Sequence, residues 1–223
     1  MRKFLGIALI ILGLIVLGLY FGFGYLMRQT SDTAFIEELS AEELQANNQL
    51  EIINNYESVS NVSVIDAYIK LNEVSTEYVI GQIVIPDVNI NLPVSRGTNE
   101  SNLLLGATTM RADQMMGQGH YPLAGHNISR KGVLFHGIDT LPDETDIFLT
   151  DKVDVYRYKV IDRIEIPDTD FSWLENDVAD RYGKPTMCLV TCTLPYRSGV
   201  RVIVLATLEE VTPYEGGIKI ENE

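Results

Sequence analysis

A cysteine, an arginine and a histidine lie next to short apolar runs in the second half of the chain. Cys192 ends one such run, Arg201 opens the run Val202–Leu205, and His126 follows a glycine further upstream. Cysteine-based acyl transfer uses a thiol nucleophile, an imidazole that moves protons and a fixed positive charge. These residue types therefore predict acyl-transfer chemistry, provided that the fold brings them together.

Short β-strands have to position these three groups. The last two strands are expected at residues 186–191 and 200–208, and their antiparallel pairing would place Arg201 beside Cys192. Arg197, in the connection, is the rival for the same role, and an exposed edge-strand charge explains Arg201 equally well. Many short strands with few helical patterns are typical of a mainly β fold with a closed or nearly closed barrel. Other elements are expected as strands at residues 78–85, 88–94, 121–125, 146–149 and 153–160, a helical turn at 102–105, a short helix at 132–141 and a mixed loop at 164–182.

The remaining cysteine and histidines have simpler interpretations. Cys188 is expected to be a small buried hydrophobic residue, and a buried structural role is also the alternative for Cys192. Two cysteines four residues apart in one strand are separated by roughly 13 Å, which is too far for a disulfide. His120 is expected in a surface loop and His136 in half-buried packing. No zinc-ligand spacing is present, so no catalytic metal is expected.

The chain begins with a long apolar segment. Residues 4–27 contain no charge and exceed the roughly 20 residues that cross a bilayer core. Basic residues precede the segment and acidic residues follow it, which favours a cytoplasmic end at residues 1–3 and an extracytoplasmic C-terminal domain. We therefore expect a single transmembrane anchor in the cell membrane. A cleaved signal peptide is the competing interpretation, but no clear small-residue cleavage site follows the segment.

Composition divides the rest of the chain, whose 223 residues suit one span and one domain. Residues 28–76 are rich in Glu, Gln, Asn and Leu, and we interpret them as an extracytoplasmic stalk or an appendage packed loosely on the domain. Within them, Ser40 and Glu43 resemble a helix capping box. Residues 77–210 have β-strand character and form the expected catalytic domain, and residues 211–223 form a C-terminal tail.

The net charge of −14 excludes one class of partner. Binding to nucleic acid requires clustered Lys and Arg that neutralise phosphates, and this chain has an excess of acidic residues. The same excess argues against a polybasic membrane tether. We therefore expect no nucleic-acid partner.

Several motifs taken together resemble those of one enzyme family. The segments Leu189-Val190-Thr191-Cys192 and Leu123-Ala124-Gly125-His126-Asn127, with Arg201 downstream, are similar to the signature of the sortases. The resemblance is closest to the class A sortases of Gram-positive bacteria and covers residues 78–208. Each motif alone is weak, whereas the combination is specific. The matching positions also include Ile85-Pro86, Asn91-Leu92-Pro93-Val94 and Gly132-Val133-Leu134-Phe135.

The resemblance implies an eight-stranded β-barrel and a transpeptidase that cuts surface proteins at an LPXTG-type sorting signal, between Thr and Gly. Cys192 would then form a thioacyl-enzyme, His126 would be the acid and base, and Arg201 would support the thiolate or the oxyanion. The acceptor would be an amine of a peptidoglycan precursor, lipid II. A thioester stores the acyl energy, so no ATP is required. Thr191 and Ala124 are expected to contact the substrate.

Two departures from the family pattern matter. Cys188 replaces the usual Thr at the head of the Thr-Leu-x-Thr-Cys motif, which affects packing more than chemistry. Some class A enzymes bind calcium through acidic residues just before the histidine strand. Here Asp113 is the only acidic residue among residues 111–118. Because hard cations need several oxygen ligands, activity without calcium is expected. The positions that align with the calcium ligands are Arg111, Gln114 and Gln118.

Other functions stay open at this stage. A membrane-tethered cysteine endopeptidase would use the same three residues and transfer the acyl group to water. A non-enzymatic envelope module with a buried Cys192 is a further alternative, as is a class D sortase. Class C enzymes usually add a lid and a second span, and the sequence shows neither. The loop at residues 164–182 is expected to set the preference at the X position of the sorting signal.

Overall fold

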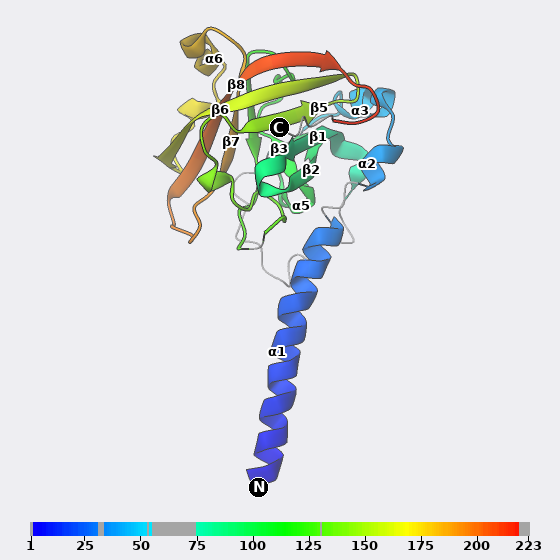
Figure 1. The fold of residues 1–223 in the computed structure, drawn as a ribbon, viewed down its shortest axis with the longest axis vertical. Coiled ribbons are helices and arrows are strands. Elements are labelled where there is room, and N and C mark those ends of the chain that lie inside the picture. Colours follow the sequence, from blue (N-terminus) through cyan, green and yellow to red (C-terminus); the bar gives the residue numbers. More distant parts are fainter. Residues whose placement is uncertain (1, 31–33, 53, 55–74, 130, 219–223) are drawn as a thin grey trace.

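A computed structural model describes residues 2–30, 34–52, 54, 75–129 and 131–218 of the chain. Within these residues, eight strands form one closed barrel in the order β1-β2-β3-β4-β7-β8-β6-β5 (Figure 1). The expected mainly β, eight-stranded architecture is therefore confirmed. The strands are β1 (Val79–Ile85), β2 (Ile90–Ser95), β3 (Ala107–Thr109), β4 (His120–Ala124), β5 (Asp146–Thr150), β6 (Asp154–Pro167), β7 (Thr186–Cys192) and β8 (Val200–Pro213).

The two faces of β7 have different neighbours. Successive side chains in a strand point to opposite faces. Leu189 accordingly packs into the barrel interior with the main core. Cys188 packs on the outer face with Val178 and Ile203, and Val190 packs against the same cluster. The outer face of β7 and β8 is therefore an apolar surface covered by the connection between β6 and β7.

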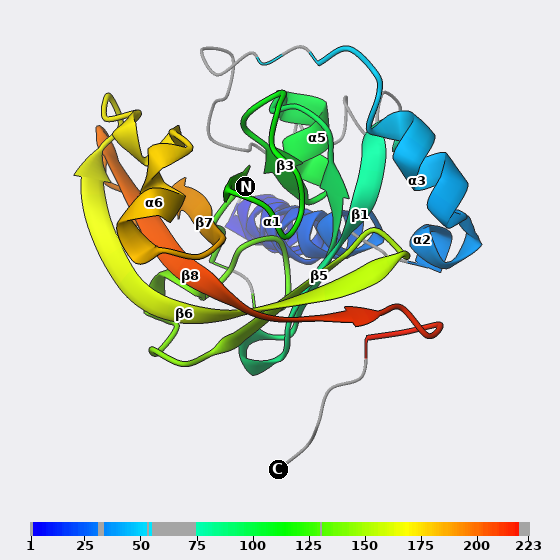
Figure 2. The same ribbon diagram turned by 90° about the horizontal axis from the view of Figure 1, so that it is seen from above.

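Short helices lie outside the barrel. Figure 2 shows α6 beside β7 and β8, whereas α2 and α3 lie on the side of β1. The helices outside the barrel are α2 (Ala34–Glu38), α3 (Ala41–Asn47), α5 (Glu100–Leu105) and α6 (Asp177–Tyr182), with 3-10 turns η1 (Thr76–Tyr78), η2 (Pro86–Val88), η3 (Ile138–Thr140) and η4 (Ser172–Leu174).

Two sequence-based expectations about these connections were wrong. Residues 164–182 are not one loop, because Ile164 and Ile166 continue β6 by pairing with Ile203 and Arg201 of β8. Residues 132–141 do not form one short helix. Leu134 has a positive φ of 49°, and the φ angles of Gly132 and Gly137 are also positive. A backbone with these angles cannot continue a right-handed helix.

The N-terminal part contains a long helix, α1 (Arg2–Thr30), which projects away from the barrel (Figure 1). Among the described residues, no helix meets both the length and the hydropathy of a membrane-crossing segment. The anchor expected at residues 4–27 is therefore not confirmed by the structure.

The described part of residues 28–76 packs on the barrel. Ser40 begins α3 with the expected capping box: its hydroxyl accepts from the Glu43 amide at 3.2 Å, and the Glu43 carboxylate accepts from the Ser40 amide at 2.7 Å. Leu44 of α3 is buried against Val79 of β1. The Arg96 guanidinium also donates to the Leu50 carbonyl at 2.7 Å. Residues 55–74 lie outside the described part, as do residues 31–33 and 219–223.

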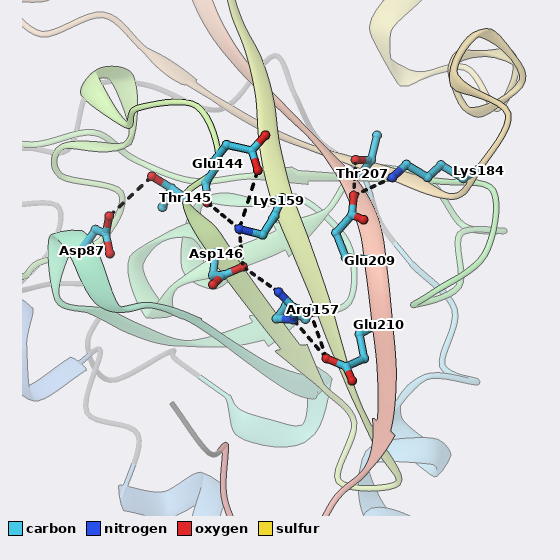
Figure 3. Close-up of polar contacts among 10 residues, drawn as sticks. All are labelled: Asp87, Glu144, Thr145, Asp146, Arg157, Lys159, Lys184, Thr207, Glu209 and Glu210. Carbon is cyan, nitrogen blue, oxygen red and sulfur yellow. Dashed lines mark hydrogen bonds and ion pairs between the residues drawn. The ribbon is translucent and has the colours of Figure 1, made fainter. Parts of the chain in front are cut away.

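Charged side chains join three neighbouring strands on the outside of the barrel (Figure 3). Arg157 of β6 lies between Asp146 of β5, at 3.4 Å, and Glu210 of β8, at 3.1 Å. Lys159, two residues along β6, also approaches Asp146 at 3.7 Å. All four side chains are partly exposed, so solvent screening keeps the contribution of each pair to stability small.

Candidate active site

The three residues that the sequence singles out line one pocket. It has a volume of about 520 Å³ and lies over the outer face of β7 and β8, where Val190 and Ile203 form its floor. Cys192, His126 and Arg201 all contribute to its lining. The fold therefore brings together a thiol, an imidazole and a guanidinium that are far apart in the sequence.

Parallel pairing of β4 with β7 places the histidine next to the cysteine. Ala124 is the Cα partner of Val190, so the segments that follow β4 and β7 leave the barrel at the same edge and at neighbouring positions. The Gly125 amide donates to the Val190 carbonyl at 3.1 Å, and the Thr191 hydroxyl donates to the Gly125 carbonyl at 2.6 Å. These bonds fix the segments that carry His126 and Cys192 relative to each other.

Gly125 allows a close approach behind the histidine. A Cβ at this position would lie 2.5 Å from the ring of Phe135, which is too close for any packed side chain. The Phe135 amide donates to the His126 carbonyl at 2.9 Å. The missing side chain thus lets the buried Phe135 support the backbone of His126 from the side of the core.

The His126 side chain is buried at the pocket, with 8% of the residue exposed. Burial lowers the pKa of this imidazole to about 4, because desolvation disfavours the charged form. Its Nε2 atom has no hydrogen-bond partner within the described residues. At neutral pH the ring is therefore uncharged, with a nitrogen free to exchange a proton with a bound molecule.

Cys192 is half-buried and lies opposite Arg201 in the register of β7 and β8. Burial raises the pKa of the Cys192 thiol; the nearby Arg201 opposes this shift and Asp168 adds to it. The Arg201 guanidinium is held by the Val200 carbonyl at 3.0 Å and by Asp168 at 3.6 Å. The thiol is thus mostly protonated at neutral pH, with a fixed cation close to it.

Apolar side chains form the other walls of the pocket. Phe171, Trp173 and Leu174, from the connection between β6 and α6, lie along one side, and Leu103 and Met110 contribute from other elements. The sequence places Trp173 in a loop expected to affect specificity. No sequence signal identified Leu103 and Met110, because their place in the pocket depends on how the barrel closes.

The two predicted substrate contacts also line the pocket. Ala124 is nearly buried there, at 9% exposure. Thr191 is buried, and its hydroxyl is engaged with the Gly125 carbonyl. The rival cation, Arg197, does not line this pocket: its guanidinium contacts the Glu165 carboxylate, and it lines a separate depression of about 200 Å³.

The structure also locates the other cysteine and histidines. Cys188 is completely buried, as expected. His136 is half-buried, and its Nδ1 donates to the Ile128 carbonyl at 2.7 Å. The expectation of a surface loop for His120 was wrong. This residue begins β4 and is fully buried, because its ring nitrogens bond to Thr186 and Trp173, which are distant in the sequence.

Residues 111–118, where the sequence predicts no calcium site, contain a guanidinium paired with the one acidic side chain. The Arg111 guanidinium donates to both carboxylate oxygens of Asp113, at 3.0 and 2.8 Å. The Gln114 side-chain oxygen accepts from the Met110 and Arg111 amides. In the part of the chain that the structure describes, no three His, Cys, Asp or Glu residues gather as a metal site would require.

A closed eight-stranded barrel with a thiol, an imidazole and a guanidinium in one pocket defines a class of cysteine acyl-transfer enzymes. Residues 83–209 match the Sortase domain family. The chain is 33% identical to Sortase A of Listeria monocytogenes over 210 residues, which is 94% of this chain and 92% of that relative. It is 41% identical to Sortase A of Bacillus anthracis over 130 residues, 58% of this chain and 60% of that relative.

The solved structure of Listeria monocytogenes sortase A is also similar, with a TM-score of 0.55 at 38% identity over 61% of this chain and 90% of that one. The chain belongs to the sortase family, with class A sortases among its relatives, and it is a cysteine transpeptidase. This finding excludes the non-enzymatic envelope module.

Proposed function

We propose that this enzyme is a membrane-anchored transpeptidase that cleaves LPXTG-type sorting signals between Thr and Gly. It then joins the new carboxyl end to an amine of a peptidoglycan precursor such as lipid II. The observation that carries this proposal is the meeting of Cys192, His126 and Arg201 in one pocket with apolar walls. Such walls suit the leucine and proline of the signal, because apolar pockets bind apolar side chains.

The first half of the proposed reaction forms a thioester. The Cys192 sulfur attacks the carbonyl carbon of the scissile bond, and its proton passes to the uncharged His126 ring. The carbon–nitrogen bond then breaks, and the imidazolium gives that proton to the leaving amine. The unpartnered Nε2 of His126 supports this role, because it faces no competing partner within the described residues.

The second half transfers the acyl group. The acceptor amine attacks the thioester, His126 takes the proton that the amine loses, and the sulfur leaves and recovers a proton. Arg201 stabilises the negative charge that develops on the carbonyl oxygen or on the sulfur. Its contacts with the Val200 carbonyl and Asp168 support a fixed orientation. The places of Ala124 and Thr191 in the pocket lining support their proposed contact with the peptide.

Anchoring in the cell membrane through residues 4–27 is part of the proposal. Large apolar side chains of α1 are exposed on the isolated chain, including Leu9 at 60%, Ile10 at 65% and Leu14 at 64%. Water is a poor environment for so many exposed apolar side chains, whereas lipid is a favourable one. Partition of the full chain into the membrane fraction, with the barrel open to protease on the outer side only, would test this part.

The reaction is tested by mixing the enzyme, an LPXTG peptide and an amine. We expect a ligated product together with an acyl adduct on Cys192 detected by mass spectrometry. Cys192→Ala is the control and should give neither, because Cys188 is completely buried and does not line the pocket. Cleaved peptide without ligation, at saturating amine, would instead establish the cysteine endopeptidase.

A further inference from the structure

The wall of the pocket is attached to the barrel at a few points. We use the name pocket wall for residues 168–174, the segment between β6 and α6 that includes Trp173 and Leu174. Several of its hydrogen bonds are local, such as the one from the Leu174 amide to the Phe171 carbonyl at 3.0 Å. Local bonds fix the shape of the segment but not its position on the barrel. Contacts with distant residues must therefore hold it in place.

His120 makes one of these contacts from the start of β4. Its Nε2 lies 2.9 Å from the Trp173 carbonyl, and its Nδ1 lies 2.7 Å from the Thr186 hydroxyl. A carbonyl oxygen can only accept, so Nε2 is the nitrogen that donates. Burial lowers the pKa of this ring to about 4, so it is neutral and Nδ1 accepts from Thr186. The His120 amide also donates to Asn176, just beyond the wall, at 2.9 Å.

Arg111 makes a second contact one residue further along. Its Nη1 donates to the Leu174 carbonyl at 3.0 Å, while Asp113 holds the rest of the guanidinium. Two consecutive carbonyls of the wall thus receive donors from the two ends of the β3–β4 connection. His120 and Arg111 do not themselves line the pocket, whereas Trp173 and Leu174 do.

We propose that His120 and Arg111 are positioning residues that lock the pocket wall through the Trp173 and Leu174 carbonyls and thereby set the affinity for the donor peptide. A wall held in its binding position before the peptide arrives lowers the ordering cost of binding. The effect on affinity rests on the proposed function, in which this pocket takes the sorting signal. The lock itself does not depend on that function.

Two substitutions at His120 separate the effect of the hydrogen bond to the pocket wall from the effect of a changed side-chain volume. In His120→Gln the side-chain amide nitrogen can occupy the place of Nε2 and donate to the Trp173 carbonyl. In His120→Asn the shorter side chain keeps a polar atom near Thr186 but does not reach that carbonyl. Because both variants place an amide in the same buried site, a difference between them reports the bond to the wall.

The first measurement needs no substrate. Trp173 is the single tryptophan of the chain, so its fluorescence reports on the wall alone. In the full chain without peptide, we expect acrylamide to quench His120→Asn about twofold more strongly than wild type, and His120→Gln to resemble wild type. Equal quenching in all three proteins would overturn the lock. Arg111→Gln, at a partly exposed side chain, should raise quenching in the same direction and decides the question if His120→Asn does not fold.

The second measurement addresses affinity. For an LPXTG peptide, His120→Asn should raise KM about tenfold, the scale of one lost hydrogen bond, with kcat within about twofold of wild type. His120→Gln should restore KM. Alkylation of Cys192 by iodoacetamide, which does not need the wall, should be unchanged. A normal KM of His120→Asn, together with raised quenching, would refute the effect on affinity but would still support the role of His120 in holding the wall. Loss of kcat and of alkylation together would refute positioning, since it would show damage to the site itself.

If wild type does not react with the peptide, the proposed function fails, and the quenching measurement still decides whether the lock exists.

Discussion

Cys192 and Arg201 face each other across the antiparallel pair of β7 and β8, as the last paired residues before the connection between these strands. Both side chains lie on the outer face of the barrel and line the same pocket. The register that runs from Thr186 opposite Thr207 fixes this relationship. A slip of one residue would turn the guanidinium to the other face of the sheet. The position of the cation thus depends on the pairing of two whole strands.

This relationship predicts the effect of removing the cation. Arg201→Ala should lower the rate of thioester formation by about 10²-fold, since one preorganised group that stabilises an oxyanion contributes on that scale. Arg201→Lys should recover only part of the rate, because an ammonium cannot bond the Val200 carbonyl and Asp168 while it faces the sulfur. Single-turnover acylation by an LPXTG peptide measures both.

Arg197→Ala is the matched control for these variants. Arg197 lies in the same connection but contacts Glu165 outside the pocket. Its removal should leave acylation within about twofold of wild type. Losses of equal size at the two positions would contradict the assignment of the cation to Arg201.

The raised pKa of the Cys192 thiol predicts how the rate of its alkylation depends on pH. Burial raises the thiol pKa, and burial also keeps the pKa of His126 near 4. At neutral pH both groups are therefore mainly uncharged. The thiolate fraction, and with it the alkylation rate, should rise about tenfold per pH unit from pH 6 to 8. Iodoacetamide kinetics measure this rate, with Cys192→Ala as the correction for Cys188.

A plateau of high reactivity below pH 7 would contradict this prediction, because it would reveal a thiolate paired with an imidazolium. Asp168→Asn provides a further check on the direction in which nearby charges shift the pKa of Cys192. The Asp168 carboxylate raises the pKa of Cys192, so its neutralisation should move the alkylation curve to lower pH. Asp170→Asn, which changes a carboxylate engaged by Ser172, should leave the curve in place.

The sequence was sufficient for the site residues that depend on strand order and local pattern. The strands expected at 186–191 and 200–208 were found as β7 and β8, and their hairpin pairing put Cys192 beside Arg201 as predicted. The end of β8 was not predicted, because it continues to Pro213 by pairing with β6, into the expected C-terminal tail. The capping box at Ser40 was also correct, because it depends on residues three apart. Local patterns of this kind are readable from one sequence.

Features that depend on distant partners were not readable. His120 appeared to belong to a surface loop because it follows a glycine, yet its ring is buried between groups 66 and 53 residues away. The pairing of Ile166 with β8 extended β6 beyond the expected end. Tertiary pairing overrides local composition in both cases, so the pocket wall and its attachment could only be seen in the fold.

The arrangement around Asp113 predicts the response to calcium. Both oxygens of this carboxylate are engaged by Arg111, and the interaction lowers the pKa of Asp113. Calcium would need several oxygen ligands, whereas the one acidic side chain of residues 111–118 is already paired with a guanidinium. Adding millimolar calcium to chelator-treated enzyme should therefore change turnover by less than about twofold. A strong rise in turnover would show that a calcium site exists in this enzyme.

The two buried imidazoles predict a loss of stability in acid. Unfolded histidine has a pKa near 6.5, whereas burial lowers the pKa of both His120 and His126 to about 4. Above pH 6.5 neither state binds a proton at these groups. As the pH falls from 6.5 toward 4, the unfolded state binds protons that the folded state does not, so the free energy of unfolding decreases. Each imidazole contributes a loss of about 2 kcal/mol by pH 5.

Urea unfolding of the full chain at pH 7.5 and pH 5.0 measures this loss. His120→Gln is the informative variant, because it removes one titrating group and retains the donor to the Trp173 carbonyl. It should reduce the difference between the two pH values by about 2 kcal/mol relative to wild type. Carboxylates contribute equally in both proteins, so their effect cancels in the comparison. An unchanged difference would mean that the His120 ring accepts a proton in the folded enzyme as readily as in the unfolded chain, and hence that burial does not keep it neutral.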